Sequence, residues 1–118
     1  MKRSEIYLKA AGVIRTNGHY KGDYFGYPAA GVGVCPSRTE SPVCAVGALT
    51  LVVTGDPVPE AGRLGAEVDE LVADFANRII GRRDRTEPIF AVAVWNDAPE
   101  RTPADVIDAF EQAAREAA

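Results

Sequence analysis

Apolar side chains recur at helical spacing in three segments of the chain. The first covers residues 4–16, where Ser4 is placed to cap a helix, and the second covers residues 60–80, which have one apolar and one charged face. The third begins at Thr102, because threonine caps helices, a proline follows it at the first helical position, and Asp105 lies in the first turn. The pattern predicts three amphipathic helices.

Two further segments are apolar on every side. Residues 43–53 carry no charge, and Ser41-Pro42 before them favours a helix start. Since a helix without a polar face is usually a buried one, we expect a central helix at about residues 43–54. The run 89–95 is short enough to be a buried strand, but only the glycine-rich residues 31–34 could pair with it. We therefore interpret it as a short buried helix starting near Pro88, with a strand as the alternative.

Residues 18–41 lack any helical period and are rich in glycine and proline, which predicts a long irregular loop. A loop of this length inside a domain is often functional. Its aromatic side chains can pin it to the core or contact a partner. The candidate binding residues are Tyr20, Tyr24, Phe25 and Tyr27. The prediction for residues 1–118 is a single, mainly α domain, a bundle of about five helices with the central helix at about 43–54 and the loop at about 18–41.

Length and charge narrow the possible functions. The chain has 118 residues, which is typical of one domain, and its net charge of −4 argues against nucleic acid or an anionic membrane as the partner. The longest uncharged apolar run is too short to span a bilayer, and the first residues lack the pattern of a signal peptide. We therefore expect a cytoplasmic protein in which Cys35 and Cys44 are free thiols.

An arginine cluster is the local exception to the acidic balance. It can be a solvated helix end or a phosphate-binding patch, and acidic neighbours weaken the second interpretation. Its members are Arg78, Arg82, Arg83 and Arg85.

Cys44 is the position with the most evident chemical potential. The predicted helix start places it in a first turn, where unpaired backbone N–H groups favour a thiolate. His19 is the sole histidine, and Asn96 and Asp97 could orient it. Cysteine, histidine and an orienting Asn or Asp are the components of a thiol hydrolase, although no spacing shows that they meet. The alternative is that Cys44 is a small buried apolar residue.

A structural role for the same residues is the competing hypothesis. Asp97 lies in a turn between two apolar helices, so its carboxylate could accept hydrogen bonds from the start of the central helix near Cys44. Trp95 would anchor the core, and Gly47 inside the central helix would permit a close helix crossing. Cys44, Gly47, Trp95, Asn96 and Asp97 would then form one structural clamp.

The sequence offers no complete cofactor or metal motif. A metal site could be assembled from His19, Asp23, Cys35 and Cys44, but zinc ligands usually come in pairs two to four residues apart. Gly31-Val32-Gly33 lacks the third glycine and the lysine of phosphate-binding loops. We therefore expect neither a metal nor a cofactor.

Three motifs carry a resemblance. They are Asp23-Tyr24, Cys44-Ala45-Val46-Gly47-Ala48-Leu49, and Trp95-Asn96-Asp97-Ala98-Pro99 followed by Arg101-Thr102. With them the chain resembles an uncharacterised group of small proteins from actinobacteria and their bacteriophages. The resemblance implies a cytoplasmic setting in such a host, and it implies no catalytic residues.

The leading functional hypothesis is a non-enzymatic protein-interaction protein, such as a phage accessory or regulatory factor directed at a host protein. It rests on the long aromatic loop, since tyrosine and phenylalanine are favoured interface anchors. The alternative is a cysteine-dependent hydrolase or transferase that uses Cys44 with His19 and Asn96 or Asp97.

Overall fold

The computed structural model describes residues 1–26, 37–81 and 86–118, and within these residues the secondary structure is helical apart from two isolated β-bridges. In this described part of the chain five α-helices follow one another, together with one short 3-10 helix and one π-helix. Their bounds are α1 Arg3–Asn17, α2 Ala45–Thr54, η1 Glu60–Gly62, α3 Ala66–Phe75, η2 Ala76–Ile80, α4 Pro88–Asp97 and α5 Pro103–Ala117. This confirms the mainly α prediction.

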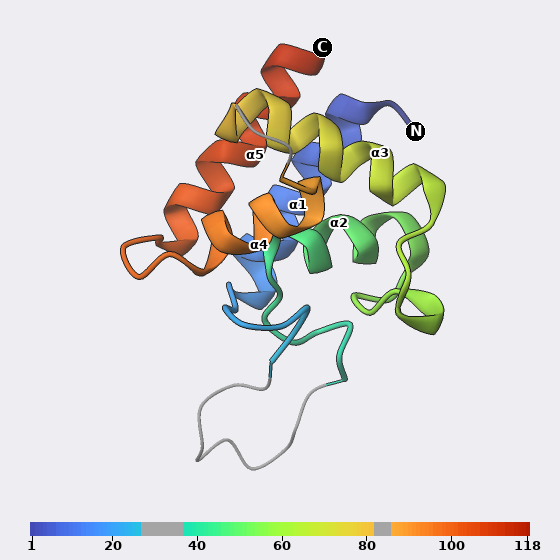
Figure 1. Ribbon diagram of the computed structural model, residues 1–118. Coiled ribbons are helices and arrows are strands. Elements are labelled where there is room, and N and C mark those ends of the chain that lie inside the picture. Colours follow the sequence, from blue (N-terminus) through green and yellow to red (C-terminus); the bar gives the residue numbers. More distant parts are fainter. Residues whose placement is uncertain (27–36, 82–85) are drawn as a thin grey trace.

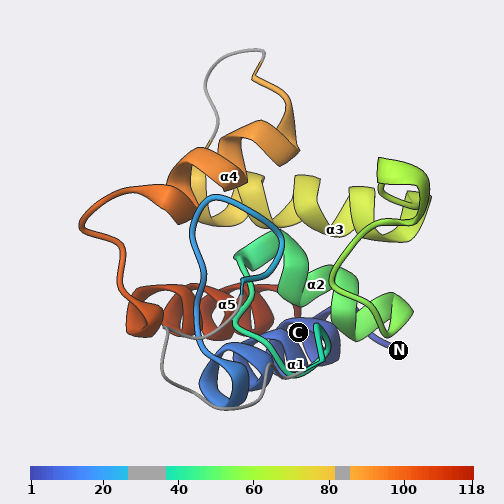
Figure 2. The same cartoon turned by 90° about the horizontal axis from the view of Figure 1, so that it is seen from below.

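Helix α2 lies at the centre of the bundle. Helices α1 and α5 pack side by side on one side of it, and α3 and α4 pack on the other (Figures 1 and 2). Residues Ala45–Thr50 of α2 are all buried, as expected for a helix without charges. The prediction of a buried central helix is therefore confirmed.

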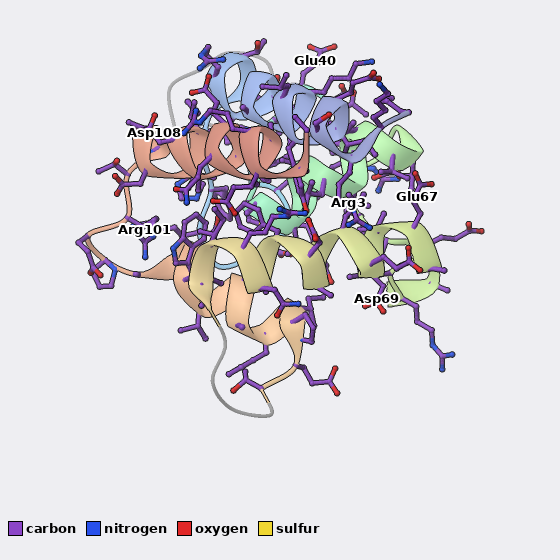
Figure 3. All side chains as sticks on the ribbon, turned by 90° about the horizontal axis from the view of Figure 1, so that it is seen from above. Arg3, Glu40, Glu67, Asp69, Arg101 and Asp108 are labelled. Carbon is purple, nitrogen blue, oxygen red and sulfur yellow. The ribbon has the colours of Figure 1, made fainter. Side chains whose placement is uncertain are left out.

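Aromatic rings join the two sides of the bundle. Phe75 of α3 is fully buried, and its ring centroid lies 4.8 Å from that of Phe110 on α5 and 6.1 Å from that of Tyr7 on α1. Its contact with Trp95 of α4 is edge-on, at 5.5 Å. Offset and edge-to-face ring pairs add to the stability that burial alone provides. Side chains fill the space between these helices (Figure 3).

The boundary between α1 and α3 also contains an ion-pair network. The Tyr7 hydroxyl donates to Asp74 Oδ2 at 2.6 Å, and Arg78 Nε and Arg3 Nη1 donate to the same carboxylate at 2.7 and 3.2 Å. Burial disfavours the charged form of Asp74, but the hydrogen bonds from Arg78 and Tyr7 outweigh it and hold its pKa below the usual value. Arg78 is therefore engaged structurally, while Arg82, Arg83 and Arg85 lie outside the described residues.

Two predicted helix starts were wrong. Helix α1 begins at Arg3 after Lys2, so Ser4 lies inside the helix and does not cap it. Helix α2 begins at Ala45 and not behind Ser41-Pro42, because the backbone before it is extended and bonded to the loop. Val43 N–H donates to the Gly18 carbonyl at 3.2 Å, and Tyr20 N–H donates to the Val43 carbonyl at 2.9 Å.

The predicted helix at 60–80 is interrupted, whereas the segment around 89–95 is indeed helical. Residues 63–65 separate η1 from α3, and Ala61 has a φ of 54°, which a continuing helix does not allow. Gly81 N–H donates to the Ala76 carbonyl at 3.0 Å, which closes η2 as a π turn. Ala91 N–H donates to the Glu87 carbonyl at 2.9 Å in the first turn of α4.

The central position of α2 leads to a stability prediction. Leu49 is 0% exposed, so Leu49→Ala should lower the free energy of unfolding by about 2–5 kcal/mol through lost burial and a residual cavity. Urea unfolding followed by far-UV circular dichroism measures the change. Leu8→Ala on α1 is the matched control, because Leu8 is 54% exposed and its loss should cost less than about 0.5 kcal/mol. Equal effects of the two substitutions would contradict the central role of α2.

Candidate functional site

The side-chain amide of Asn96 lies where α4, α2 and the loop at 18–26 meet. Asn96 is 1% exposed, and its Oδ1 accepts a hydrogen bond from Ala45 N–H at 2.9 Å. His19 Nε2 lies 2.7 Å from the same oxygen. Asn96 Nδ2 donates to the Tyr20 carbonyl and to Asp97 Oδ1, both at 3.0 Å. Two donors and two acceptor positions are all an asparagine amide offers, so the group is saturated.

This network fixes the protonation of His19. The backbone N–H of Ala45 can only donate and the carbonyl of Tyr20 can only accept, so the orientation of the Asn96 amide is determined. His19 Nε2 then faces an acceptor and must carry the proton. Burial, the largest effect, lowers the pKa of His19 and so favours the neutral Nε2–H tautomer.

The start of α2 supports the loop at close range. Cys44 N–H donates to the Tyr24 carbonyl at 3.1 Å, and a Cβ built on Gly47 would lie 2.1 Å from the same oxygen. No side chain can fit there without moving the loop. Gly47 thus admits the backbone of a loop, and the close helix crossing expected at this position was wrong.

Asp97 does not perform the role predicted for it. It is exposed, and its Oδ1 accepts from Gly22 N–H at 3.0 Å, so it holds the loop and not the start of α2. The neighbouring Asn96 provides the acceptor for α2. Lys21 adds a second tie, since its Nζ donates to the Ala98 carbonyl at 2.7 Å. A clamp between α4 and α2 exists, with the amide at its centre in place of the carboxylate.

Cys44 is the N-cap of α2. Its Sγ accepts a hydrogen bond from Gly47 N–H at 3.2 Å. Burial raises the pKa of the Cys44 thiol to about 11, and the negative charge of Asp97 acts in the same direction against the backbone donors. The thiolate expected from the position in the helix is therefore disfavoured.

A cavity of about 320 Å³ opens between the loop, the start of α2 and α4. Its wall is mostly apolar, and Asp23, Asn96 and Asp97 are its polar side chains. The apolar part is formed by Tyr24, Cys44, Val46, Ile89, Phe90 and Ala93.

The outer face of α4 continues this apolar surface. Phe90 is 62% exposed and Val94 is 57% exposed, one helical turn apart. With Ala93, Asp97, Ala98 and Pro99 they line a second, more open hollow next to the cavity. We call the cavity and this face together the α4 surface. Sequence reasoning missed it, because the run 89–95 was expected to be buried on every side.

The predicted binding residues lie next to this surface to different degrees. Tyr24 lines the cavity, whereas Phe25 is partly buried and pairs with Val43 across a β-bridge. The Tyr20 ring covers Gly26, where an added Cβ would lie 1.9 Å from it. Tyr27, like Cys35, is outside the described residues.

Trp95 packs against the core ring of Phe75 and against Arg101. The guanidinium of Arg101 lies 4.4 Å above the Trp95 ring centroid, and Arg101 Nε donates to the Trp95 carbonyl.

No group of three or more His, Cys, Asp and Glu side chains able to hold a metal occurs among the described residues. In the same residues no helix is both long and apolar enough to cross a membrane.

The amide network leads to a second stability prediction. Asn96→Ala leaves Ala45 N–H, His19 Nε2–H and the Tyr20 carbonyl without this partner. At about 1–3 kcal/mol for each buried group, the two backbone groups alone should cost about 2–6 kcal/mol. Chemical denaturation measures it. Asp97→Asn is the control, since it keeps an Oδ1 acceptor for Gly22 N–H and should cost less than about 1 kcal/mol. A larger loss of stability in Asp97→Asn than in Asn96→Ala would instead make Asp97 the centre of the clamp.

His19 leads to a prediction about pH. Burial lowers its pKa, the hydrogen bond to Asn96 opposes this, Lys21 and Arg101 lower it further and Asp97 raises it. Because the folded pKa is below the unfolded one, the contribution to stability is complete above about pH 6.5 and is lost as the pH falls through the folded pKa.

Urea midpoints between pH 5 and 7.5 should therefore fall with decreasing pH, and His19→Gln should flatten this dependence. Glutamine can still donate to Asn96 but does not titrate, and His19 is the chain's sole histidine. If the urea midpoint of His19→Gln changed with pH as steeply as that of the wild type, protonation of His19 would not be the cause of the pH dependence.

Comparison with known proteins gives a family and no activity. A family of unknown function, DUF6197, matches residues 1–116. No curated protein and no solved structure matches the chain. Because the match covers nearly all residues, the chain belongs to the DUF6197 family.

Proposed function

We propose that this chain is a non-enzymatic protein-interaction protein that binds its partner through the α4 surface. The observation that supports this proposal is the exposure of Phe90 and Val94 on one helix face beside an apolar cavity. Contiguous apolar surface on a folded protein marks interaction sites more often than chance exposure does. Cavities flanked by exposed aromatic and aliphatic side chains are the usual places where a partner's anchor residue is buried.

The rigidity of the surface supports the same proposal. One wall of the cavity is a loop whose only strand-like pairing among the described residues is two isolated β-bridges to Val43, and it is held further by the hydrogen bonds of Asn96, Asp97 and Cys44. A preformed site spends less of its binding free energy on ordering itself. The loop therefore presents Tyr24 to a partner at little entropic cost.

A cysteine-dependent hydrolase is the second candidate, because Asn96 contacts His19 as an orienting residue contacts a catalytic base. Two findings weigh against it. Burial raises the pKa of the Cys44 thiol to about 11, so little thiolate forms at pH 7. In the described part of the chain, Cys44 Sγ accepts a hydrogen bond from Gly47 N–H and makes none with His19. The Cys44 sulfur therefore serves as a helix cap.

The setting is part of the proposal and comes from the resemblance. We propose that the partner is a host protein in the cytoplasm of an actinobacterium and that the chain acts there as a phage accessory or regulatory factor. The acidic net charge of −4 fits a protein partner better than nucleic acid.

Capture from an actinobacterial lysate tests the proposal. The wild-type chain should recover a stoichiometric protein partner, and Phe90→Glu with Val94→Glu should reduce recovery at least about ten-fold, since a charge is costly in an apolar interface. Leu8→Glu is the matched control, because Leu8 is equally exposed on α1, which lies across α2 from α4 (Figure 2). Equal recovery by all three proteins would contradict the assignment to the α4 surface.

Thiol labelling separates the two candidates. In a Cys35→Ser background, Cys44 should react with iodoacetamide at pH 7 more slowly than a free cysteine, because its thiol is protonated and capped. Rapid labelling at pH 6 would favour the hydrolase.

A further inference from the structure

The charged side chains that line the cavity are both carboxylates. Asp23 stands at the loop side and Asp97 at the end of α4, and both are exposed. Each Oδ1 accepts a hydrogen bond from the loop backbone. The donor to Asp23 is Tyr24 N–H at 2.7 Å, and the donor to Asp97 is Gly22 N–H at 3.0 Å. These contacts keep both carboxylates on the loop side of the cavity.

The direction of α4 adds to this negative potential. The helix ends at Asp97, and its last turn contains no basic residue. The negative end of its macrodipole therefore lies at Asp97. A cation at the cavity would meet the two carboxylates, with this helix end nearby.

Two basic side chains already contact the carbonyls at the end of α4. Lys21 Nζ donates to the carbonyls of Ala98 and Pro99, at 2.7 and 3.3 Å. Arg101 lies over the ring of Trp95 and donates to its carbonyl. They reduce the negative potential, but neither forms an ion pair with Asp23 or Asp97 among the described residues.

The size of the cavity limits what enters it. At about 320 Å³ it lies at the lower end of the range of roughly 300–1,000 Å³ that small-molecule sites occupy. A single large apolar side chain fits such a space better than a whole cofactor does. The exposed Phe90 and Val94 beside it can then contact the next apolar residue of the same segment.

We infer that the partner of the α4 surface is a polypeptide segment that places a large apolar side chain in the cavity and an adjacent lysine or arginine at the rim formed by Asp23 and Asp97. This inference rests on the proposed function and specifies the chemistry of the partner. The apolar side chain supplies the affinity, and the cation selects against acidic and neutral segments.

Defined peptides test the inference without knowledge of the natural partner. The probe is a twelve-residue peptide with phenylalanine and leucine four residues apart and a lysine beside each. One comparison peptide has glutamate in place of both lysines, and another has serine in place of both apolar residues. Amide chemical shifts of the full-length chain report binding and locate it at residues such as Tyr24, Val46 and Ala93.

The basic apolar peptide should shift these amides and should bind at least about five-fold more tightly than the glutamate peptide at low ionic strength, where the Debye length is about 30 Å. The difference should shrink at higher salt. Asp97→Asn and Asp23→Asn each keep an Oδ1 acceptor for the loop backbone but remove the negative charge. Each substitution should weaken binding of the basic peptide about two- to five-fold, as the loss of an exposed ion pair does.

Asp108→Asn is the matched control, because Asp108 is an exposed carboxylate on α5 that points away from α4 (Figure 3). It should leave the affinity unchanged. Equal affinity for the lysine and glutamate peptides, or equal effects of Asp97→Asn and Asp108→Asn, would overturn the inference and leave the proposed function intact. Absence of shifts at the cavity with every peptide, together with lysate capture that ignores Phe90→Glu and Val94→Glu, would overturn both.

Discussion

The buried amide of Asn96 is the interaction on which the rest of the site depends. A buried amide is unfavourable unless its donors and acceptors are matched, and here all four positions have partners from three different segments. That requirement fixes the rotation of α4 against α2 and the path of the loop past both. The same hydrogen bonds determine the tautomer of His19, so one side chain connects packing with protonation.

The cavity follows from this arrangement. The loop approaches α2 so closely that Gly47 must lack a side chain, and the Tyr24 carbonyl then caps the helix start through Cys44 N–H. The sulfur of Cys44 completes the cap by accepting from Gly47 N–H. A thiol used in this way is held in its protonated form by burial, which is why a constellation with the composition of a thiol hydrolase serves as a support for the loop.

The sequence predicted the helices well and the contacts between them poorly. Periodicity identifies an amphipathic helix locally, whereas the start of α2 depends on the pairing of Val43 with residues more than fifteen positions away, which no local pattern contains. Asn96 and Asp97 are neighbours in the sequence, and their side chains lie about 100° apart around α4. Because the run before them is apolar on every side, its pattern does not indicate which of the two faces inward. A usable signal existed, because Val92 and Asn96 are four residues apart on one face, and a buried position favours a neutral amide over a carboxylate.

The four-residue spacing also gives α4 one buried face and one exposed apolar face. Val92 and Asn96 are its buried positions, and Phe90, Val94 and Asp97 are spaced to form the outer one. The fold itself gains little from a phenylalanine that is 62% exposed, and exposed apolar surface favours aggregation. Packing therefore accounts for the inner face alone. The outer face, with Asp97 at one end and an apolar cavity beside it, is what the proposed partner would cover.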